Sequence, residues 1–110
     1  MIIQTVKFES TLPEDVVLRN AAERTPRYRA VPGLVQKYYT RLEGQNRWGG
    51  ILVWESMEAL AAFRETELSQ TIASAYGVKG APDVEILEVF DVLRETGPEA
   101  AAFAPTALHA

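Results

Sequence analysis

A lysine and a tyrosine within a predicted β-strand are the residues of this sequence best suited to chemistry. Lys37 and Tyr39 lie two residues apart in the segment 34–43. Successive side chains of a strand point to opposite faces, so these two share one face. A lysine with a lowered pKa can accept a proton, its ammonium can stabilise an oxyanion, and a tyrosine hydroxyl can donate a hydrogen bond. The pair could therefore bind a small acidic molecule and stabilise its anion.

Two more aromatic residues are candidates for the lining of such a pocket. A hairpin loop at residues 44–47 would place Lys37 roughly opposite Trp54, which would then form an apolar wall. A register slip of one residue would move Trp54 to the other face of the sheet. Tyr76 stands at the edge of a Gly-rich loop, residues 77–82. It is either a lid over the pocket or an ordinary surface or core aromatic.

The same side chains allow three interpretations, and residue types alone do not decide among them. Lys37, Tyr39 and Trp54 could pack structurally in the sheet, with the lysine ammonium reaching water. They could line a small-molecule pocket between the sheet and the helices. They could also lie in a dimer interface, because the sequence does not show which sheet face looks at the helices. No residue is assigned as catalytic on these grounds.

Several cofactor classes lack the residues they need. The sequence has no cysteine and a single histidine, His109, so a metal site built from thiolates or several imidazoles is excluded. A haem with a proximal histidine would need His109, which lies near the C-terminus. No Gly-x-Gly-x-x-Gly follows a predicted strand, so the dinucleotide fingerprint is absent. We therefore expect any reaction here to use no metal, haem or flavin.

Charge and hydropathy exclude two further classes of partner. The net charge is −4 and the basic residues form no long cluster, which argues against nucleic acid and anionic membrane as partners. No apolar run reaches the roughly 20 residues that a membrane helix needs. The chain opens directly into a strand pattern, without the features of a signal peptide. A cytoplasmic protein is the expectation.

Hydrophobic periodicity and turn residues predict strands and helices in a single domain. Strands are expected near residues 2–9, 34–43, 48–55 and 83–94, and helices near 12–29 and 57–75 with a break around 66. This βαββαβ order is the ferredoxin-like plan, an α+β fold whose antiparallel sheet carries both helices on one face. The domain would span residues 1–95, and residues 96–110 are interpreted as a flexible tail or a strap along a partner.

Local signals at the helix ends sharpen these bounds. Thr11 and Glu14 match a capping box at the start of the first helix, and Ser56 is a typical N-cap for the second. Pro26 should kink or end the first helix near Thr25, because proline cannot donate the helical hydrogen bond.

Basic residues cluster at the end of the first predicted helix. Arg24, Arg27 and Arg29 are interpreted most simply as a solvated helix end, where cations favour the negative pole of the helix dipole. The alternative is that one of them lines a pocket for an anionic or phenolic ligand.

The predicted strand at residues 48–55 has two unusual features. Gly49 and Gly50 weaken a strand, so they indicate a bulge or a close approach by another backbone or a ligand. The run 51–54 is apolar on both faces, as is much of 83–94. An apolar sheet face left bare by the helices would associate. We therefore predict a homodimer in which two sheets pack face to face into an α/β barrel.

Three segments carry a resemblance to a known family: residues 32–37, 49–54 and 84–92. They resemble the YdhR-type mono-oxygenase family, which belongs to the dimeric α/β-barrel superfamily of the antibiotic-biosynthesis mono-oxygenases. The resemblance covers roughly residues 1–95. It implies cofactor-independent oxygenation of phenolic or polycyclic compounds in some members, and haem degradation, decarboxylation or isomerisation in others.

The resemblance and the residues together give two functional hypotheses. The first is a cofactor-independent mono-oxygenase that acts on a small aromatic or phenolic compound between sheet and helices. The second is a non-catalytic small-molecule-binding or dimerisation module on the same fold, since a fold alone does not fix a function.

Overall fold

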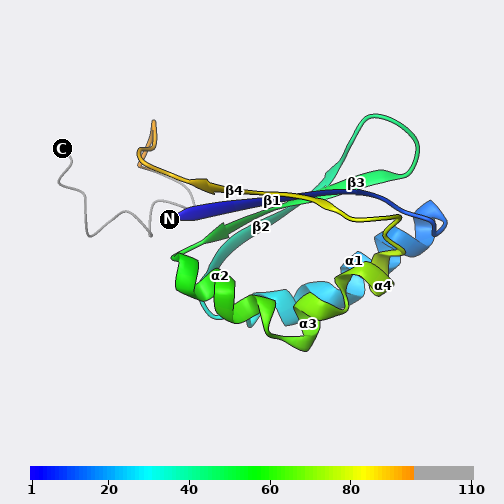
Figure 1. Cartoon of the computed structure of the whole chain (residues 1–110), viewed down its shortest axis with the longest axis horizontal. Helices are drawn as coiled ribbons and strands as arrows, with labels where there is room; N and C mark the ends of the chain where they lie inside the picture. The colour runs from blue at the N-terminus through cyan, green and yellow to red at the C-terminus, as the bar shows by residue number, and fades with distance from the viewer. Residues whose placement is uncertain (96–110) are drawn as a thin grey trace.

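The computed structural model describes residues 1–95, and the predicted tail at residues 96–110, with His109, lies outside this part. The ferredoxin-like α+β fold is confirmed. The sheet has the antiparallel order β2-β3-β1-β4, and the helices lie together on one side of it (Figure 1). No helix among residues 1–95 is long and apolar enough to cross a membrane. The elements are β1 (Ile2–Glu9), α1 (Glu14–Arg29), β2 (Leu34–Arg41), β3 (Arg47–Trp54), α2 (Met57–Arg64), α3 (Glu67–Gln70), α4 (Ile72–Tyr76) and β4 (Asp83–Glu88).

The core lies between the sheet and the helices. Alternate side chains of β3 point toward the helices, and Trp48, Leu52 and Trp54 among them are buried. The indole N–H of Trp54 donates to Oε1 of buried Gln4 on β1 at 3.0 Å, which satisfies the one polar group of this side chain. The main cluster of buried apolar residues comprises Ile2, Tyr28, Leu52, Trp54, Leu60, Phe63 and Leu68.

The two predicted helix caps have different outcomes. The cap at Ser56 is confirmed, because its Oγ accepts from the backbone N–H of Ala59 at 3.1 Å. The capping box at Thr11 is wrong. Helix α1 begins at Glu14, and the Thr11 hydroxyl instead donates to the carbonyl of Gly77 at 3.0 Å. Thr11 thus ties the entry of α1 to the end of α4 and leaves the helix N-terminus without a side-chain cap.

Helix α1 runs through Pro26 to Arg29, the end that the predicted range 12–29 gave it, so only the alternative that the proline ends the helix near Thr25 is wrong. Tyr28, two residues beyond the proline, exposes only 4% of its surface and belongs to the main core cluster. Burial of that large side chain offsets the hydrogen bond lost at Pro26 and keeps the last turn helical.

Strand β4 is shorter than predicted, ending at Glu88 rather than near residue 94. Its neighbour β1 begins at Ile2, which pairs with Glu88. Beyond Glu88, the backbone N–H of Val89 still donates to the carbonyl of Met1, the residue before β1, at 3.0 Å. Phe90 is then 96% exposed. The apolar run continues past the place where its partner strand starts, so it cannot extend the described sheet.

Candidate functional site

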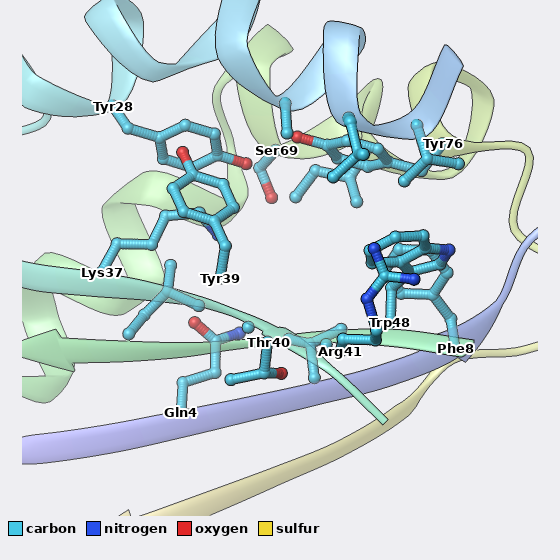
Figure 2. A pocket seen from close by; sticks show the side chains of 18 of the residues that line it. Gln4, Phe8, Tyr28, Lys37, Tyr39, Thr40, Arg41, Trp48, Ser69 and Tyr76 are labelled. Carbon is cyan, nitrogen blue, oxygen red and sulfur yellow. The ribbon is translucent and has the colours of Figure 1, made fainter. Parts of the chain in front are cut away.

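A cavity of about 290 Å³ lies between the sheet and the helices (Figure 2). Strands β1, β2 and β3 form its floor, and α1, α3 and α4 contribute to its roof. Its volume is close to the lower end of the roughly 300–1,000 Å³ that is typical of small-molecule sites. The apolar walls are formed by Val6, Phe8, Val17, Leu18, Ala21, Trp48, Leu52, Phe63 and Ile72.

Two glycines shape the floor of this cavity. A Cβ at Gly50 would lie 3.2 Å from Nζ of Lys37, so the missing side chain leaves room for the lysine. A Cβ at Gly49 would lie 2.7 Å from the backbone oxygen of Val6, which confirms the predicted close approach of another backbone. The expected bulge is not at these glycines, because the β2–β3 pairing shifts at the start of β2 instead.

Lys37 points from β2 into the space between sheet and helices and lines the cavity. Its Nζ lies 4.5 Å from the ring centroid of Tyr28 and 4.7 Å from that of Tyr39, within cation–π range. No carboxylate of residues 1–95 forms an ion pair with it. Burial, with a smaller contribution from the charge of Arg24, lowers the pKa of Lys37 to about 8. Near that pH a large fraction of Lys37 is neutral and able to accept a proton.

Tyr39 stands at the edge of the cavity and is 45% exposed. Its hydroxyl shares a hydrogen bond of 2.8 Å with the hydroxyl of Thr25 on α1. Tyr28, Lys37 and Tyr39 also border a second, more polar cavity of about 360 Å³ beside Gln36. Lys37 therefore lies between an inner apolar cavity and an outer polar one.

Tyr76 lines the inner cavity from the helix side and is only 7% exposed. Its ring centroid lies 5.8 Å from that of Phe8 and 5.7 Å from Cζ of Arg24. Its buried hydroxyl has no hydrogen-bond partner among residues 1–95. Burial raises the pKa of Tyr76 to about 12, so its hydroxyl stays protonated at neutral pH.

Arg24 was predicted to be part of a solvated helix end, and this is wrong. One terminal nitrogen of its guanidinium donates to the carbonyl of Leu68 at 2.6 Å, and both terminal nitrogens lie 3.2 Å from the hydroxyl of Thr71. These bonds fasten α1 to the α3–α4 segment behind Tyr76. The spacing along the helix could have indicated that Arg24 faces the protein interior. Arg24 lies four residues before buried Tyr28 and seven after buried Val17, so the three share one helix face.

Trp54 does not line the cavity, and Trp48 does. The register explains this, because Lys37 pairs with Leu52 and not with Trp54 as predicted. The N–H of Leu42 donates to the carbonyl of Arg47 at 2.9 Å, so the hairpin loop is residues 43–46, one position earlier than expected. A loop shift of one position moves the register by two residues, which keeps the face and changes the neighbour.

Asn46 is the residue that sets this loop. It adopts a positive φ of 55°, and its side-chain amide nitrogen donates to the carbonyls of Ser10 and Leu12 at 3.0 and 2.6 Å. Its Oδ1 accepts from the indole N–H of Trp48 at 2.8 Å. The loop is therefore anchored on the β1–α1 connection, a tertiary contact that strand patterning cannot reveal.

The polar lining of the cavity consists mainly of hydrogen-bond donors. No Asp or Glu lines it, although the chain as a whole carries a net charge of −4. Figure 2 shows the polar groups of Tyr28, Lys37, Ser69 and Tyr76 gathered toward the helix side. Within residues 1–95 no cluster of His, Cys, Asp or Glu could hold a metal ion. Such a lining favours an aromatic ligand with acceptor oxygens or a negative charge.

Comparison with known proteins identifies the fold. No protein-family profile and no curated protein sequence matches the chain. A solved structure named antibiotic biosynthesis monooxygenase matches 83% of this chain and 100% of its own, with a TM-score of 0.69 and 17% identity. SnoaB, a cofactor-independent oxygenase from Streptomyces nogalater, matches 84% and 95%, with a TM-score of 0.70 and 15% identity. A dimeric ferredoxin-like protein of unknown function from Jannaschia sp. CCS1 matches 81% and 100%, with a TM-score of 0.63 and 14% identity.

The chain has the fold of the antibiotic biosynthesis monooxygenases. At these identities the likeness concerns the fold alone. Of the candidate site residues, Lys37, Tyr39 and Tyr76 lie on that cavity and Trp54 lies behind it in the core. Their role in binding a substrate stays a prediction.

Proposed function

We propose that this protein is a cofactor-independent mono-oxygenase that acts on a small aromatic or phenolic compound in the inner cavity. The observation that carries the proposal is Lys37, a lysine without an ion-pair partner in the described chain, whose pKa is lowered to about 8 beside an aromatic cavity. The shared fold with SnoaB supports the same reaction class. The proposal includes membership of the YdhR-type family, because residues 32–37, 49–54 and 84–92 resemble that family.

The chain's own groups suffice for the first step of this chemistry. Neutral Lys37 takes the proton of the bound hydroxyl, and the resulting ammonium faces the oxyanion it has created. The hydroxyl of Tyr28 adds a neutral donor on the helix side. The apolar walls keep water from the electron-rich anion, which then serves as the reductant of molecular oxygen.

The overall reaction balances without a cofactor. A phenol with a free ring position and one molecule of oxygen give a quinone and one molecule of water. One oxygen atom enters the ring as the new carbonyl. The other leaves as water with the hydroxyl proton and the ring hydrogen, so all four electrons come from the substrate.

Lys37 also permits the second hypothesis, a non-catalytic binding module. Its ammonium could act only as the counter-ion of a bound anion. Oxygen uptake, measured with an oxygen electrode against a panel of phenols, separates the two. Uptake by the wild type that is lost in Lys37→Met supports the mono-oxygenase. Phenolate binding without uptake supports the binding module.

We further propose that the protein acts as a homodimer through the sheet face opposite the helices. Strand register places Tyr38, Ile51 and Leu87 on this face. Tyr38 and Leu87 are 41% and 43% exposed although both are large and apolar. The dimeric ferredoxin-like protein from Jannaschia has the same fold, which supports this arrangement.

A further inference from the structure

Tyr76 carries a polar group that the free protein leaves unsatisfied. The residue is 7% exposed, and its hydroxyl has no hydrogen-bond partner among residues 1–95. A buried donor without an acceptor destabilises a fold, so such groups are rare and call for an explanation. Figure 2 shows the Tyr76 ring extending over the cavity near Ser69, whose side chain also points inward.

Contacts at the backbone and on the ring of Tyr76 fix the position of this hydroxyl. The backbone carbonyl of Tyr76 accepts from the buried hydroxyl of Ser10 at 2.6 Å. Phe8 packs on the ring, and Arg24 lies over it with Cζ 5.7 Å from the centroid. Arg24 also holds the α3–α4 segment through Leu68 and Thr71. The tyrosine is thus held at its backbone and on its ring, and its hydroxyl remains available.

The structure assigns to Tyr76 the role of a hydrogen-bond donor to the ligand, with Arg24 as its positioning residue. The ligand would be an aromatic compound with two different oxygens. An ionisable hydroxyl would face Lys37, and a neutral acceptor such as a carbonyl would receive the bond from Tyr76. This inference deepens the proposed function and concerns the same cavity. Because burial raises the pKa of Tyr76 to about 12, the group is a neutral donor over the whole range in which Lys37 titrates.

Thermal unfolding of the free protein gives a first test that needs no ligand. Tyr76→Phe removes an unpaired buried hydroxyl, so its Tm should equal or exceed that of the wild type. The matched control is Tyr39→Phe, which deletes the 2.8 Å hydrogen bond to Thr25 and should lower the Tm. A Tm for Tyr76→Phe that falls as far as that of the control would show a structural partner for the hydroxyl and overturn the assignment.

Calorimetric titration without oxygen gives the second test, with 4-hydroxyacetophenone and 4-ethylphenol as probes. The two differ in a carbonyl oxygen and little in shape. Comparing each variant with the wild type for each probe cancels the difference in acidity between the probes. Tyr76→Phe should lower the affinity for 4-hydroxyacetophenone by about tenfold and the affinity for 4-ethylphenol by less than about twofold. Lys37→Met should weaken both.

Arg24 variants distinguish positioning from general damage. Arg24→Met should weaken the ketone selectively although the tyrosine hydroxyl is still present, and Arg24→Lys should restore part of the difference. Equal effects of Tyr76→Phe on the two probes, or a wild type that binds neither, would overturn the inference. Selective ketone binding without any oxygen uptake would keep the Tyr76 assignment and refute the proposed oxygenation.

Discussion

The backbone of Gly50 makes the place for the ammonium of Lys37 on the neighbouring strand. A Cβ at Gly50 would stand 3.2 Å from Nζ, closer than most such contacts. The two residues belong to adjacent strands and point to the same face of the sheet. The glycine therefore lets a lysine occupy the floor of an otherwise apolar cavity, where burial lowers its pKa.

Gly50→Ala should impair the site more than the fold. The new methyl group meets the far end of a flexible lysine, which can move by a few tenths of an ångström. The free energy of unfolding should stay within about 1 kcal/mol of the wild type, because alanine also costs less strand entropy than glycine. Affinity for a phenolate should fall as Lys37 is displaced, which titration calorimetry would detect.

Gly49→Ala is the control for this prediction. Its Cβ would lie 2.7 Å from the backbone oxygen of Val6 and 2.8 Å from the hydroxyl of Thr40. Backbone cannot move aside as a lysine end does, so this variant should lose about 1–3 kcal/mol of stability in urea unfolding. Equal stability of the two variants would contradict the close contact between Gly49 and the backbone of Val6.

Lys37 should make the stability of the protein depend on pH in a defined window. Its pKa is about 8 in the folded protein and 10.5 when unperturbed, so between these values the unfolded chain binds more protons. Stability therefore rises with pH across that window, by up to about 3 kcal/mol, and the gain is absent below pH 8. Urea unfolding of the wild type and of Lys37→Met at pH 7, 8, 9 and 10 measures this.

The difference between the two proteins is the quantity to follow. Burial raises the pKa values of Tyr28 and Tyr76, which lowers stability where tyrosines ionise, near and above pH 10, in both proteins. Subtracting the free energy of unfolding of Lys37→Met from that of the wild type at each pH removes the contribution of the tyrosines. Lys37→Met should be at least as stable as the wild type at pH 7, and parallel pH curves would refute a buried lysine with a lowered pKa.

The fold was predictable because each element carries its own signal. Ser56, a typical N-cap residue, predicts the start of α2. The order of strands and helices along the chain allows few topologies. The extent of β4 was not predictable, since it depends on where β1 begins. The predicted range 12–29 already carried α1 past Pro26, but not the reason, which is the burial of Tyr28 in a core formed by distant residues.

The candidate site was predictable only where a local sequence pattern determines it. Lys37 and Tyr39 share a face whatever the register, so strand alternation alone places them together. The choice between Trp54 and Trp48 depended on where the hairpin turns, and Asn46 sets that through carbonyls of the β1–α1 connection. Arg24 looked like a surface cation, because its partners Leu68 and Thr71 lie more than 40 residues away.

A charge introduced on the outer sheet face should separate the proposed homodimer. Ile51→Lys places an ammonium among the apolar side chains of that face, where a paired sheet could not hydrate it. Sedimentation velocity at micromolar concentration should then show a monomer in place of a dimer. Met57→Lys, at a 43% exposed position on the first turn of α2, is the control and should leave the dimer intact. A monomeric wild type would refute the proposal.

Burial and, to a smaller extent, the charge of Arg24 should determine the pH dependence of the proposed reaction. If neutral Lys37 is the base, the rate of oxygen uptake rises with pH and levels off above an apparent pKa of about 8. The charge of Arg24 contributes to that lowered value, after burial. Arg24→Gln keeps hydrogen-bonding groups but removes the charge, so the rising limb of the pH–rate profile should move to higher pH. The move should be smaller than the lowering of the Lys37 pKa that burial causes.

Arg24→Lys keeps the charge and loses the two-pronged contact with Leu68 and Thr71. Its rising limb should stay near that of the wild type although its thermal stability falls. This pairing separates the electrostatic effect of Arg24 on Lys37 from its structural effect on the α3–α4 segment. A limb that moves equally in both variants would mean that Arg24 acts on the reaction only by holding that segment. A limb that moves in neither would remove Arg24 from the titration of Lys37.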